Sequence, residues 1–450
     1  MIEGCNFRGK DLKFYIPGVD LTSNIFTIVV GRNGAGKSLL LRQLIASVAN
    51  VNEVVSERSE YYVKDDVKAS VSYVWLPTKI IASSTSPFDK FPVDKKNEYL
   101  GNYDYVGLKG LYSHNLSLSY MSRIIGRLVR SINSDNGQLK AIMNVFAYMG
   151  YHGYMEARMM MEPSPTTVIK ILASENPREG FLSYLESRYR KGWTQGPRAS
   201  LEEAVVYVDE ILNAYRYFAR FNMKPRLDLV INQTGVFEKK TGARIDQEFD
   251  LLLRFGFLRL RDITLHKIGV ARQFRINDAS SGEQCVLMAL LGIASNIEDG
   301  ALVCIDEPEV CLHPEWQERF IGLLIDSFSS FARCHFVIAT HSPQIISSLS
   351  SNNCYVLDIQ KNETIEAGVL NKRSADFQLA SVFGAPGYKN EYLSRELLNA
   401  LVTLGSGVKL SPERIKILEG MIELRSVLRP SDPVLRLIDL LTEALEEEEI

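Results

Sequence analysis

The sequence lacks the features that mark membrane and secreted proteins. It has no apolar run approaching the ~20 residues that a membrane-spanning helix requires, and it does not open on a basic segment followed by an apolar one. Its formal net charge of −3 gives no overall positive field of the kind that is typical of nucleic-acid-binding proteins. Hydrophobic content of 46% and charged content of 23% are ordinary for a globular protein. We therefore expect a cytoplasmic chain with no membrane partner.

Cysteine is scarce and scattered. The six cysteines show no C-x-x-C spacing, and Cys311 and His313 have no second pair beside them, so zinc is not expected. Free thiols fit a reducing cytoplasm. The sequence also lacks an acidic D-x-D of the kind that holds metals in Toprim nucleases, and it lacks the His and Asn arrangement of an HNH nuclease. We expect the chain to have no nuclease activity of its own.

Charge is uneven along the chain. Basic residues cluster within residues 123–130, 188–191 and 254–275, whereas the tail at 446–449 is acidic. Solvated helix faces explain most clusters of this kind, and direct DNA contact stays open as an alternative.

A glycine-rich loop lies between a predicted strand and a predicted helix. Residues 31–38 read GRNGAGKS and satisfy G-x-x-x-x-G-K-[ST]. An apolar stretch at 25–30 precedes the loop, and residues 39–45 have the apolar spacing of a helix. Glycines let backbone N–H groups turn toward phosphates, and the helix N-terminus adds partial positive charge. The predicted ATP-binding residues are Arg32, Asn33, Gly34, Ala35, Gly36, Lys37 and Ser38. Lys37 would reach the outer phosphates, and the Ser38 hydroxyl would sit on Mg²⁺.

Two carboxylates follow a second predicted strand. Residues 301–308 read ALVCIDEP, an apolar run that ends in Asp306 and Glu307. Asp306 is predicted to hold Mg²⁺ through water. Glu307 is predicted to be the general base for an attacking water, a role generally worth ~10²–10⁴ in rate. Two acids that merely cap the next helix would not explain the apolar run before them. His341 follows a third strand-like run at 336–339.

These segments occur in the order found in the ABC ATPases, and residues 280–284, SSGEQ, resemble the signature motif of that family. The resemblance implies that Ser281, Gly282 and Glu283 complete the ATP site of a second copy, so that two heads enclose two ATP molecules. It also implies that His341 is the switch histidine that contacts the γ-phosphate. Ser-Ser-Gly fits a helix N-cap as well. Both interpretations can hold, because a helix N-terminus aimed across an interface attracts an anion.

The predicted fold class is α/β: an ABC-type P-loop ATPase head with antiparallel N-terminal strands, a helical insert and a helical C-terminal region. Residues 6–16 resemble the opening of SMC-like, RecF-like and OLD ATPase heads. We expect an N-terminal lobe at 1–115, a compact helical insert at 116–225, a C-terminal lobe at 226–371 and a partner-binding helical region at 372–450. Prolines within the insert interrupt any long coiled coil.

One departure from the family concerns its Q-loop. No glutamine stands in residues 82–91, where the family normally has one. The second Mg²⁺ ligand is therefore open, with Ser84 and Thr85 as candidates.

Two further segments narrow the resemblance. Residues 84–91, together with 373–380 and 383–393, resemble the stand-alone ATPases of bacterial anti-phage systems, in particular the PtuA family of Septu and some retron systems. The resemblance implies dimers or higher oligomers that restrain a separate HNH nuclease until a phage-derived or DNA trigger appears. Three alternatives stay open: a RecF-like or SMC-like DNA clamp in repair, an AriA-like ATPase of a PARIS system with a Toprim partner, and a transporter ATPase. The missing glutamine and the N-terminal pattern disfavour the transporter.

The C-terminal segment from residue 391 onward has helical apolar spacing. Leu397, Leu398 and Leu401 form a predicted apolar stripe, and the acidic end could steer a basic partner. We expect this region to dock the nuclease or a neighbouring ATPase subunit. The alternative is that these helices cover the sheet of their own head.

Overall fold

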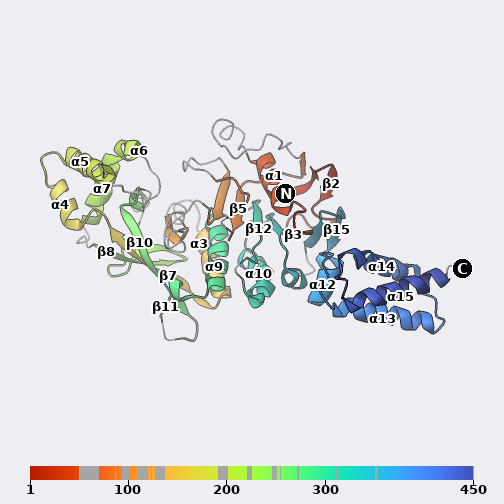
Figure 1. Ribbon diagram of the computed structural model, residues 1–450. Helices are drawn as coiled ribbons and strands as arrows, with labels where there is room; N and C mark the ends of the chain where they lie inside the picture. The colour runs from red at the N-terminus through yellow and green to blue at the C-terminus, as the bar shows by residue number, and fades with distance from the viewer. Residues whose placement is uncertain are drawn as a thin grey trace.

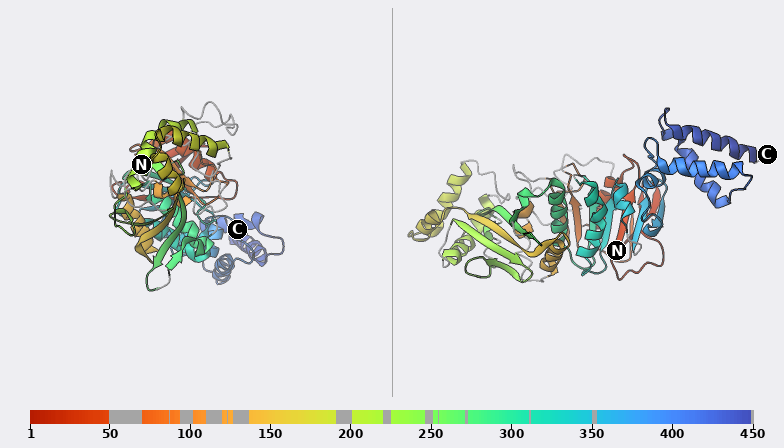
Figure 2. Two further views of the ribbon diagram at one scale, coloured as in Figure 1. Left: turned by 90° about the vertical axis from the view of Figure 1, so that its left-hand side faces the viewer. Right: turned by 90° about the horizontal axis from the view of Figure 1, so that it is seen from below.

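The molecule has three parts arranged in a row: a central head, an arm on one side and a C-terminal helical unit on the other (Figures 1 and 2). The computed structural model describes residues 1–49, 70–86, 88–93, 102–109, 120–122, 124–126, 137–190, 201–219, 225–245, 251–253, 255–270, 273–310, 312–349 and 353–448. The arginines of the 123–130 cluster and Cys311 lie outside these residues.

A seven-stranded sheet of order β15-β14-β3-β13-β12-β5-β6 forms the centre of the head. Its strands are β3 (Ile25–Val30), β5 (Ile80–Ser84), β6 (Tyr103–Gly107), β12 (Leu302–Asp306), β13 (His335–Ala339), β14 (Cys354–Asp358) and β15 (Glu363–Glu366). Each pairs in parallel with its neighbours, except the antiparallel β15. The central strands are buried on both faces, which explains their continuous apolar runs. The carboxyl ends of β3, β12, β13 and β5 therefore meet at one edge.

Different elements pack on the two faces of this sheet. Along β3, Ile25 and Val29 pack into the cluster beneath α1 (Lys37–Val48) and the antiparallel strands, whereas Phe26 and Ile28 pack into the opposite cluster. Those antiparallel strands have the order β2-β1-β4 and are β1 (Ile2–Phe7), β2 (Lys10–Lys13) and β4 (Val71–Tyr73). The opposite face is covered by α3 (Gly137–Tyr148), α9 (Ser281–Ala294), α10 (Pro314–Ser327) and α11 (Pro343–Ser347). The predicted α/β head with antiparallel N-terminal strands is confirmed.

The arm is built on a second, antiparallel sheet of order β11-β10-β7-β8-β9. Its strands are β7 (Tyr151–Met161), β8 (Arg226–Asn232), β9 (Gly235–Glu238), β10 (Leu258–Lys267) and β11 (Gln273–Arg275). Helices α4 (Pro165–Leu172), α5 (Pro177–Arg190), α6 (Leu201–Val206) and α7 (Val208–Ala219) belong to its outer end (Figure 1).

The sequence predicts a helical insert at 116–225, but the structure shows that the insert is only partly helical. Strand β7 lies inside it and forms the central strand of the arm sheet. Met155, Met159 and Met161 alternate into the core with near-complete burial. Methionine is a good helix former, so a run of methionines hides the period of two that marks a strand.

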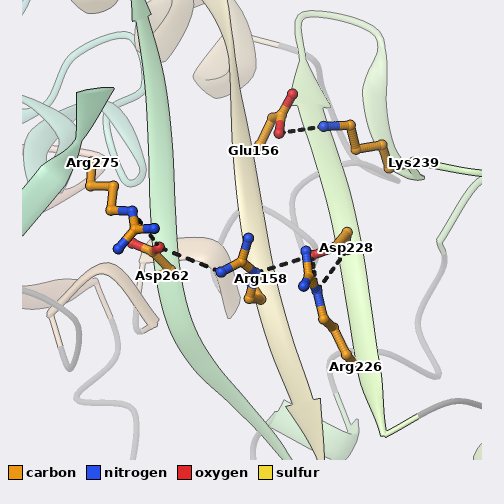
Figure 3. Close-up of polar contacts among 7 residues, drawn as sticks. All are labelled: Glu156, Arg158, Arg226, Asp228, Lys239, Asp262 and Arg275. Carbon is orange, nitrogen blue, oxygen red and sulfur yellow. Dashed lines mark hydrogen bonds and ion pairs between the residues drawn. The ribbon is translucent and has the colours of Figure 1, made fainter. Parts of the chain in front are cut away.

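The other face of the arm sheet carries a row of opposite charges (Figure 3). Arg158 on β7 lies between two carboxylates, 3.4 Å from Asp228 on β8 and 3.8 Å from Asp262 on β10. Arg226 and Arg275 flank the same two carboxylates. Burial alone would raise the pKa of Asp228, but the two neighbouring guanidinium groups outweigh it and hold that pKa below its ordinary value. The row links four of the five strands across the sheet.

The C-terminal part is helical, as predicted. It comprises α12 (Ala375–Ser381), α13 (Glu391–Gly405), α14 (Pro412–Ile422) and α15 (Pro433–Glu448). The last three have a core of their own that includes Leu393, Leu397, Leu418, Ile438 and Leu441. They project from the head beyond α12 instead of lying over its sheet (Figures 1 and 2). Short 3₁₀ turns at Ile276–Asp278, Ala367–Val369 and Glu423–Val427 complete the described elements.

Among the described residues, no helix is both long enough and apolar enough to cross a bilayer. The described cysteines, Cys5, Cys285, Cys304, Cys334 and Cys354, are buried free thiols.

Candidate nucleotide site

The glycine loop joins β3 to α1 at the carboxyl edge of the main sheet. Gly34 and Gly36 have φ angles of 79° and 101°, which residues with a Cβ rarely adopt. A Cβ on Gly36 would lie 3.1 Å from the Phe7 ring and 3.2 Å from Nη1 of Arg8. Both the conformation and the close approach therefore require glycine there. The loop thus has the glycine-dependent backbone between strand and helix that the motif predicts, and phosphate binding by it stays a prediction.

Lys37 opens α1 and is buried beneath the loop. Its ammonium donates to the carbonyl oxygen of Gly31 at 3.1 Å and contacts the imidazole of His341. Burial lowers the pKa of Lys37, while the nearby carboxylates, Glu307 first among them, oppose that shift. The strand-end segments of β3 and β13 are thus joined through this side chain.

Ser38 and Asp306 lie side by side. The Ser38 hydroxyl donates to Oδ1 of Asp306 at 3.0 Å. Burial raises the pKa of Asp306 to about 7, with the hydroxyl of Ser38 opposing and other carboxylates reinforcing the shift. A hydroxyl and a carboxylate in a carboxylate-rich site fit Mg²⁺, which typically takes one or two protein oxygens together with phosphate and water. The described residues hold no cluster of three or more His, Cys, Asp or Glu that could bind a metal alone.

Glu307 and His341 face each other across the site. Oε1 of Glu307 lies 3.6 Å from Nε2 of His341. Burial, and then the charge of Lys37, lowers the pKa of His341 to about 4, so the imidazole is neutral at pH 7. Glu307 has a φ angle of 47°, an uncommon conformation for a side-chain-bearing residue that is often found at functional sites. Its backbone N–H is held by the carbonyl of Ala339 at 2.9 Å.

Glu309 is a site residue that the sequence interpretation missed. Its Oε1 accepts the backbone N–H of His341, and the carboxyl group is largely buried. Burial raises the pKa of this carboxyl group. Glu309 therefore links the loop after β12 to the loop after β13. Its position two residues after Glu307 was the only available sequence signal.

Arg8 was also missed. It occupies the turn between β1 and β2 with a φ angle of 52°, and its Nη1 donates to the carbonyl of Ala35 at 3.2 Å. The N-terminal hairpin thus braces the glycine loop from outside.

Ser84 and Thr85, the two candidates to replace the family's glutamine as a Mg²⁺ ligand, lie at the end of β5. Ser84 is paired in register with Asp306, and its hydroxyl donates to that residue's backbone carbonyl at 3.4 Å. The Thr85 hydroxyl donates to the carbonyl of Val310 at 3.3 Å. Both are buried next to the Asp306 strand. A role of either as Mg²⁺ ligand stays a prediction.

The signature segment forms the N-terminus of α9. Ser280 caps the helix by accepting the backbone N–H of Glu283, and Ser281 is exposed beside it while Gly282 is buried. The Glu283 carboxylate is buried, accepts the hydroxyl of Tyr151 and lies 3.9 Å from Nζ of Lys267. Glu283 therefore packs toward the arm, and a contact between its side chain and ATP stays a prediction.

Helix α9 lies on the opposite face of the sheet from α1 and packs against β5 and β6. It precedes β12 through a short connection, so its N-terminus points to the same edge of the sheet as the glycine loop. The glycine loop and the N-terminus of α9 thus lie at the same edge of the sheet but beside different strands.

Comparison with known proteins finds distant similarity to an AAA domain family and to a probable ATPase. The family described as "AAA domain, putative AbiEii toxin, Type IV TA system" matches residues 161–347. The chain is 29% identical over 127 residues to "Retron Ec83 probable ATPase" of Escherichia coli, covering 25% of this chain and 22% of that protein. It is 25% identical over 181 residues to "Septu protein PtuA" of Bacillus thuringiensis, covering 36% and 44%. These matches confirm the predicted resemblance as distant homology. The matched segments span less than half of either relative.

Solved structures with similar chains include an ATP-binding cassette of an ABC transporter in its ADP conformation, at 10% identity and a TM-score of 0.26. That alignment covers 85% of this chain and 94% of the other. The Pyrococcus furiosus Smc head bound to the C-terminal domain of ScpA aligns at 13% identity and a TM-score of 0.28, covering 82% and 97%. At these TM-scores the fold assignment rests on the sheet order and the glycine loop themselves.

Proposed function

We propose that this chain, a distant relative of the retron Ec83 ATPase and of PtuA, is a cytoplasmic ATPase that requires ATP and Mg²⁺. The observation that carries the proposal is the convergence of Lys37, Ser38, Asp306, Glu307 and His341 at the ends of three neighbouring strands. These residues come from segments far apart in the chain, and their types are those that phosphate transfer to water needs.

Each side chain has a distinct role in the proposed reaction. Ser38 and Asp306 would hold Mg²⁺, which supplies charge neutralisation at the phosphates when bound. Lys37 would exchange its present partners for the outer phosphate oxygens. Glu307 would accept a proton from the attacking water, whose oxygen bonds to the γ-phosphorus as ADP leaves. The neutral His341 would donate a hydrogen bond to the γ-phosphate while Glu309 fixes its backbone.

We further propose that two chains associate head to head around ATP. The exposed Ser281 at a capped helix N-terminus, together with Gly282, would contact the nucleotide of the opposite copy. The placement of α9 and α1 on opposite faces of the sheet supports an intermolecular role, as does the shared edge at which both begin.

The biological proposal is that this ATPase senses infection and controls a separate nuclease subunit of HNH type. The names of the two relatives, one from a retron and one from Septu, support it. The C-terminal unit is the candidate docking surface, and of the predicted stripe Leu398 is exposed while Leu401 is partly buried against the unit's core. Leu397 is fully buried in the unit's own core, whereas Leu398 and Val402 on α13 are 48% and 68% exposed.

Two variants separate ATP binding from ATP turnover. Lys37→Ala should abolish nucleotide binding without unfolding the head, because it removes a phosphate ligand and leaves only a small void. Glu307→Gln should bind Mg-ATP normally but release phosphate ~10²-fold more slowly or worse. Calorimetry and phosphate-release kinetics measure the two effects. An unchanged ATP affinity in Lys37→Ala, or undiminished turnover in Glu307→Gln, would contradict the proposal.

A further inference from the structure

The glycine loop is held by a part of the chain that carries none of the ATP motifs. The backbone N–H of Arg32 donates to the side-chain Oε1 of Gln360 at 2.9 Å. Gln360 follows β14, and its own backbone N–H donates to Asp358 Oδ1 at 2.8 Å. The side chain of Asp358 thus fixes the turn that presents the Gln360 amide to the loop.

A second contact comes from the connection between α12 and α13. Gly384 lies there with a φ angle of 58°, and a Cβ on it would lie 3.0 Å from Nη2 and 3.2 Å from Nε of Arg32. The guanidinium of Arg32 therefore rests against Gly384. The ammonium of Lys361 donates to the carbonyl of Ser381 at 3.0 Å, which ties the Gln360 turn to the end of α12.

The chain between Gly384 and α13 is short and well anchored. The backbone N–H of Ala385 donates to the carbonyl of Leu379 at 2.9 Å. Asn390 is buried, donates its amide to Pro386 at 2.8 Å, and caps α13 by accepting the N–H of Leu393 at 2.9 Å. A continuous set of hydrogen-bonded segments thus connects the glycine loop to the first turn of the C-terminal unit.

We propose that Gln360 and Gly384 are positioning residues of the glycine loop, and that through them ATP binding is coupled to the placement of the C-terminal unit, α13 to α15. The inference rests on the proposed function, because it takes the loop as the phosphate-binding element. Arg32 is the second residue of that loop, so a shift of its backbone changes the cradle that follows. By linkage, if the placement of the C-terminal unit changes the affinity for ATP, ATP binding shifts the placement equilibrium of that unit by the same factor.

A matched pair of glycine variants tests this. Gly384 and Gly387 both have positive φ angles, 58° and 76°, but a Cβ on Gly387 meets nothing within 4 Å. Alanine therefore imposes similar backbone strain at both positions, and Gly384→Ala in addition displaces the exposed guanidinium of Arg32 from its contact with the α12–α13 connection. We expect Gly384→Ala to weaken Mg-ATP binding about 5-fold or more by calorimetry, within the usual range of coupling between sites. Gly387→Ala should bind as the wild type does.

Gln360→Met supplies an independent test, because it keeps the side-chain length and removes the acceptor. In the absence of nucleotide, hydrogen exchange at the Arg32 amide should accelerate in this variant. In the wild type, Mg-ATP should change exchange in the first turn of α13, and Gly384→Ala should diminish that response. Equal ATP affinity in Gly384→Ala and Gly387→Ala, with unchanged exchange at Arg32 in Gln360→Met, would overturn the inference and leave the ATPase proposal intact. Failure of the wild type to bind ATP would instead overturn the ATPase proposal.

Discussion

Burial lowers the pKa of both histidines on and after β13, His335 and His341. His341 has a pKa of about 4 and is neutral within the candidate site. His335 at the start of β13 is fully buried, and burial lowers its pKa to about 3. Its Nε2 lies 3.0 Å from the Thr27 hydroxyl, which already donates to the carbonyl of Phe14. His335 must therefore donate from Nε2 in its neutral form, and a second proton would have to be buried as charge.

The lowered pKa of His335 should make part of the free energy of unfolding sensitive to acid. Its ordinary pKa of 6.5 falls to about 3 in the folded chain. Because the unfolded chain binds the proton more readily, this component is complete above pH 6.5 and is lost as the pH falls toward 3, by at most about 1.4 kcal/mol per pH unit. His335→Gln retains a donor for Thr27 but cannot titrate. We expect its urea midpoint to fall less steeply than that of the wild type between pH 6.5 and 4.5. Parallel profiles for the two proteins would show that His335 does not contribute.

Residues inside local motifs could be predicted from the sequence, and residues that act across segments could not. Lys37, Ser38 and Asp306 follow from short patterns beside apolar runs, and the structure brings them together. Glu309 and Gln360 accept hydrogen bonds from backbone amides that lie far away in the chain. No spacing rule within one segment identifies such partners, because the fold alone creates the contact.

At the scale of elements, polar pairing rather than apolar burial holds the outer face of the arm sheet. The inner face of β7 packs methionines into the core, while Arg158 on its outer face contacts carboxylates of both neighbouring strands. Cross-strand pairs of this kind favour one strand register over others. The sequence suggested helices here because methionines dominate the inner face, and the pairing partners lie on strands that come much later in the chain.

Arg158→Met should therefore destabilise the arm more than the loss of a single surface ion pair does. It retains apolar volume but separates two carboxylates from their shared cation, and we expect a loss of about 1 kcal/mol in urea unfolding. Arg178→Met is the matched control, because Arg178 pairs only with the exposed Asp209 across α5 and α7 among the contacts described. The difference between the variants should shrink in 1 M salt, where charges are screened. Equal effects of both variants at low salt would contradict this role for Arg158.

At the scale of the molecule, the C-terminal unit has its own core and projects from the head, and the ATP motifs are complete at His341. Truncation after residue 390 keeps Gly384 and removes α13 to α15. We expect the truncated chain to hydrolyse ATP but to lose the proposed nuclease partner in pull-downs from a native host. The surface variant Leu398→Glu in the full chain should also weaken partner capture, because that side chain is exposed.

Two outcomes of that experiment would contradict the docking role. A truncated chain that still hydrolyses ATP and still captures its partner would place the docking surface elsewhere. An insoluble or nucleotide-dead truncation, together with normal partner capture by Leu398→Glu, would show that the unit serves the stability of its own head.

Sedimentation velocity of the Glu307→Gln variant tests most directly whether two heads share ATP through reciprocal glycine loops and signature segments. With Mg-ATP this variant should sediment as a stable head-to-head assembly, because ATP still bridges the heads while water activation is lost. Adding Ser281→Arg should abolish the ATP-dependent association, whereas Ser174→Arg, at an exposed serine of the arm, should not. The same ATP-dependent association with and without Ser281→Arg would contradict the account.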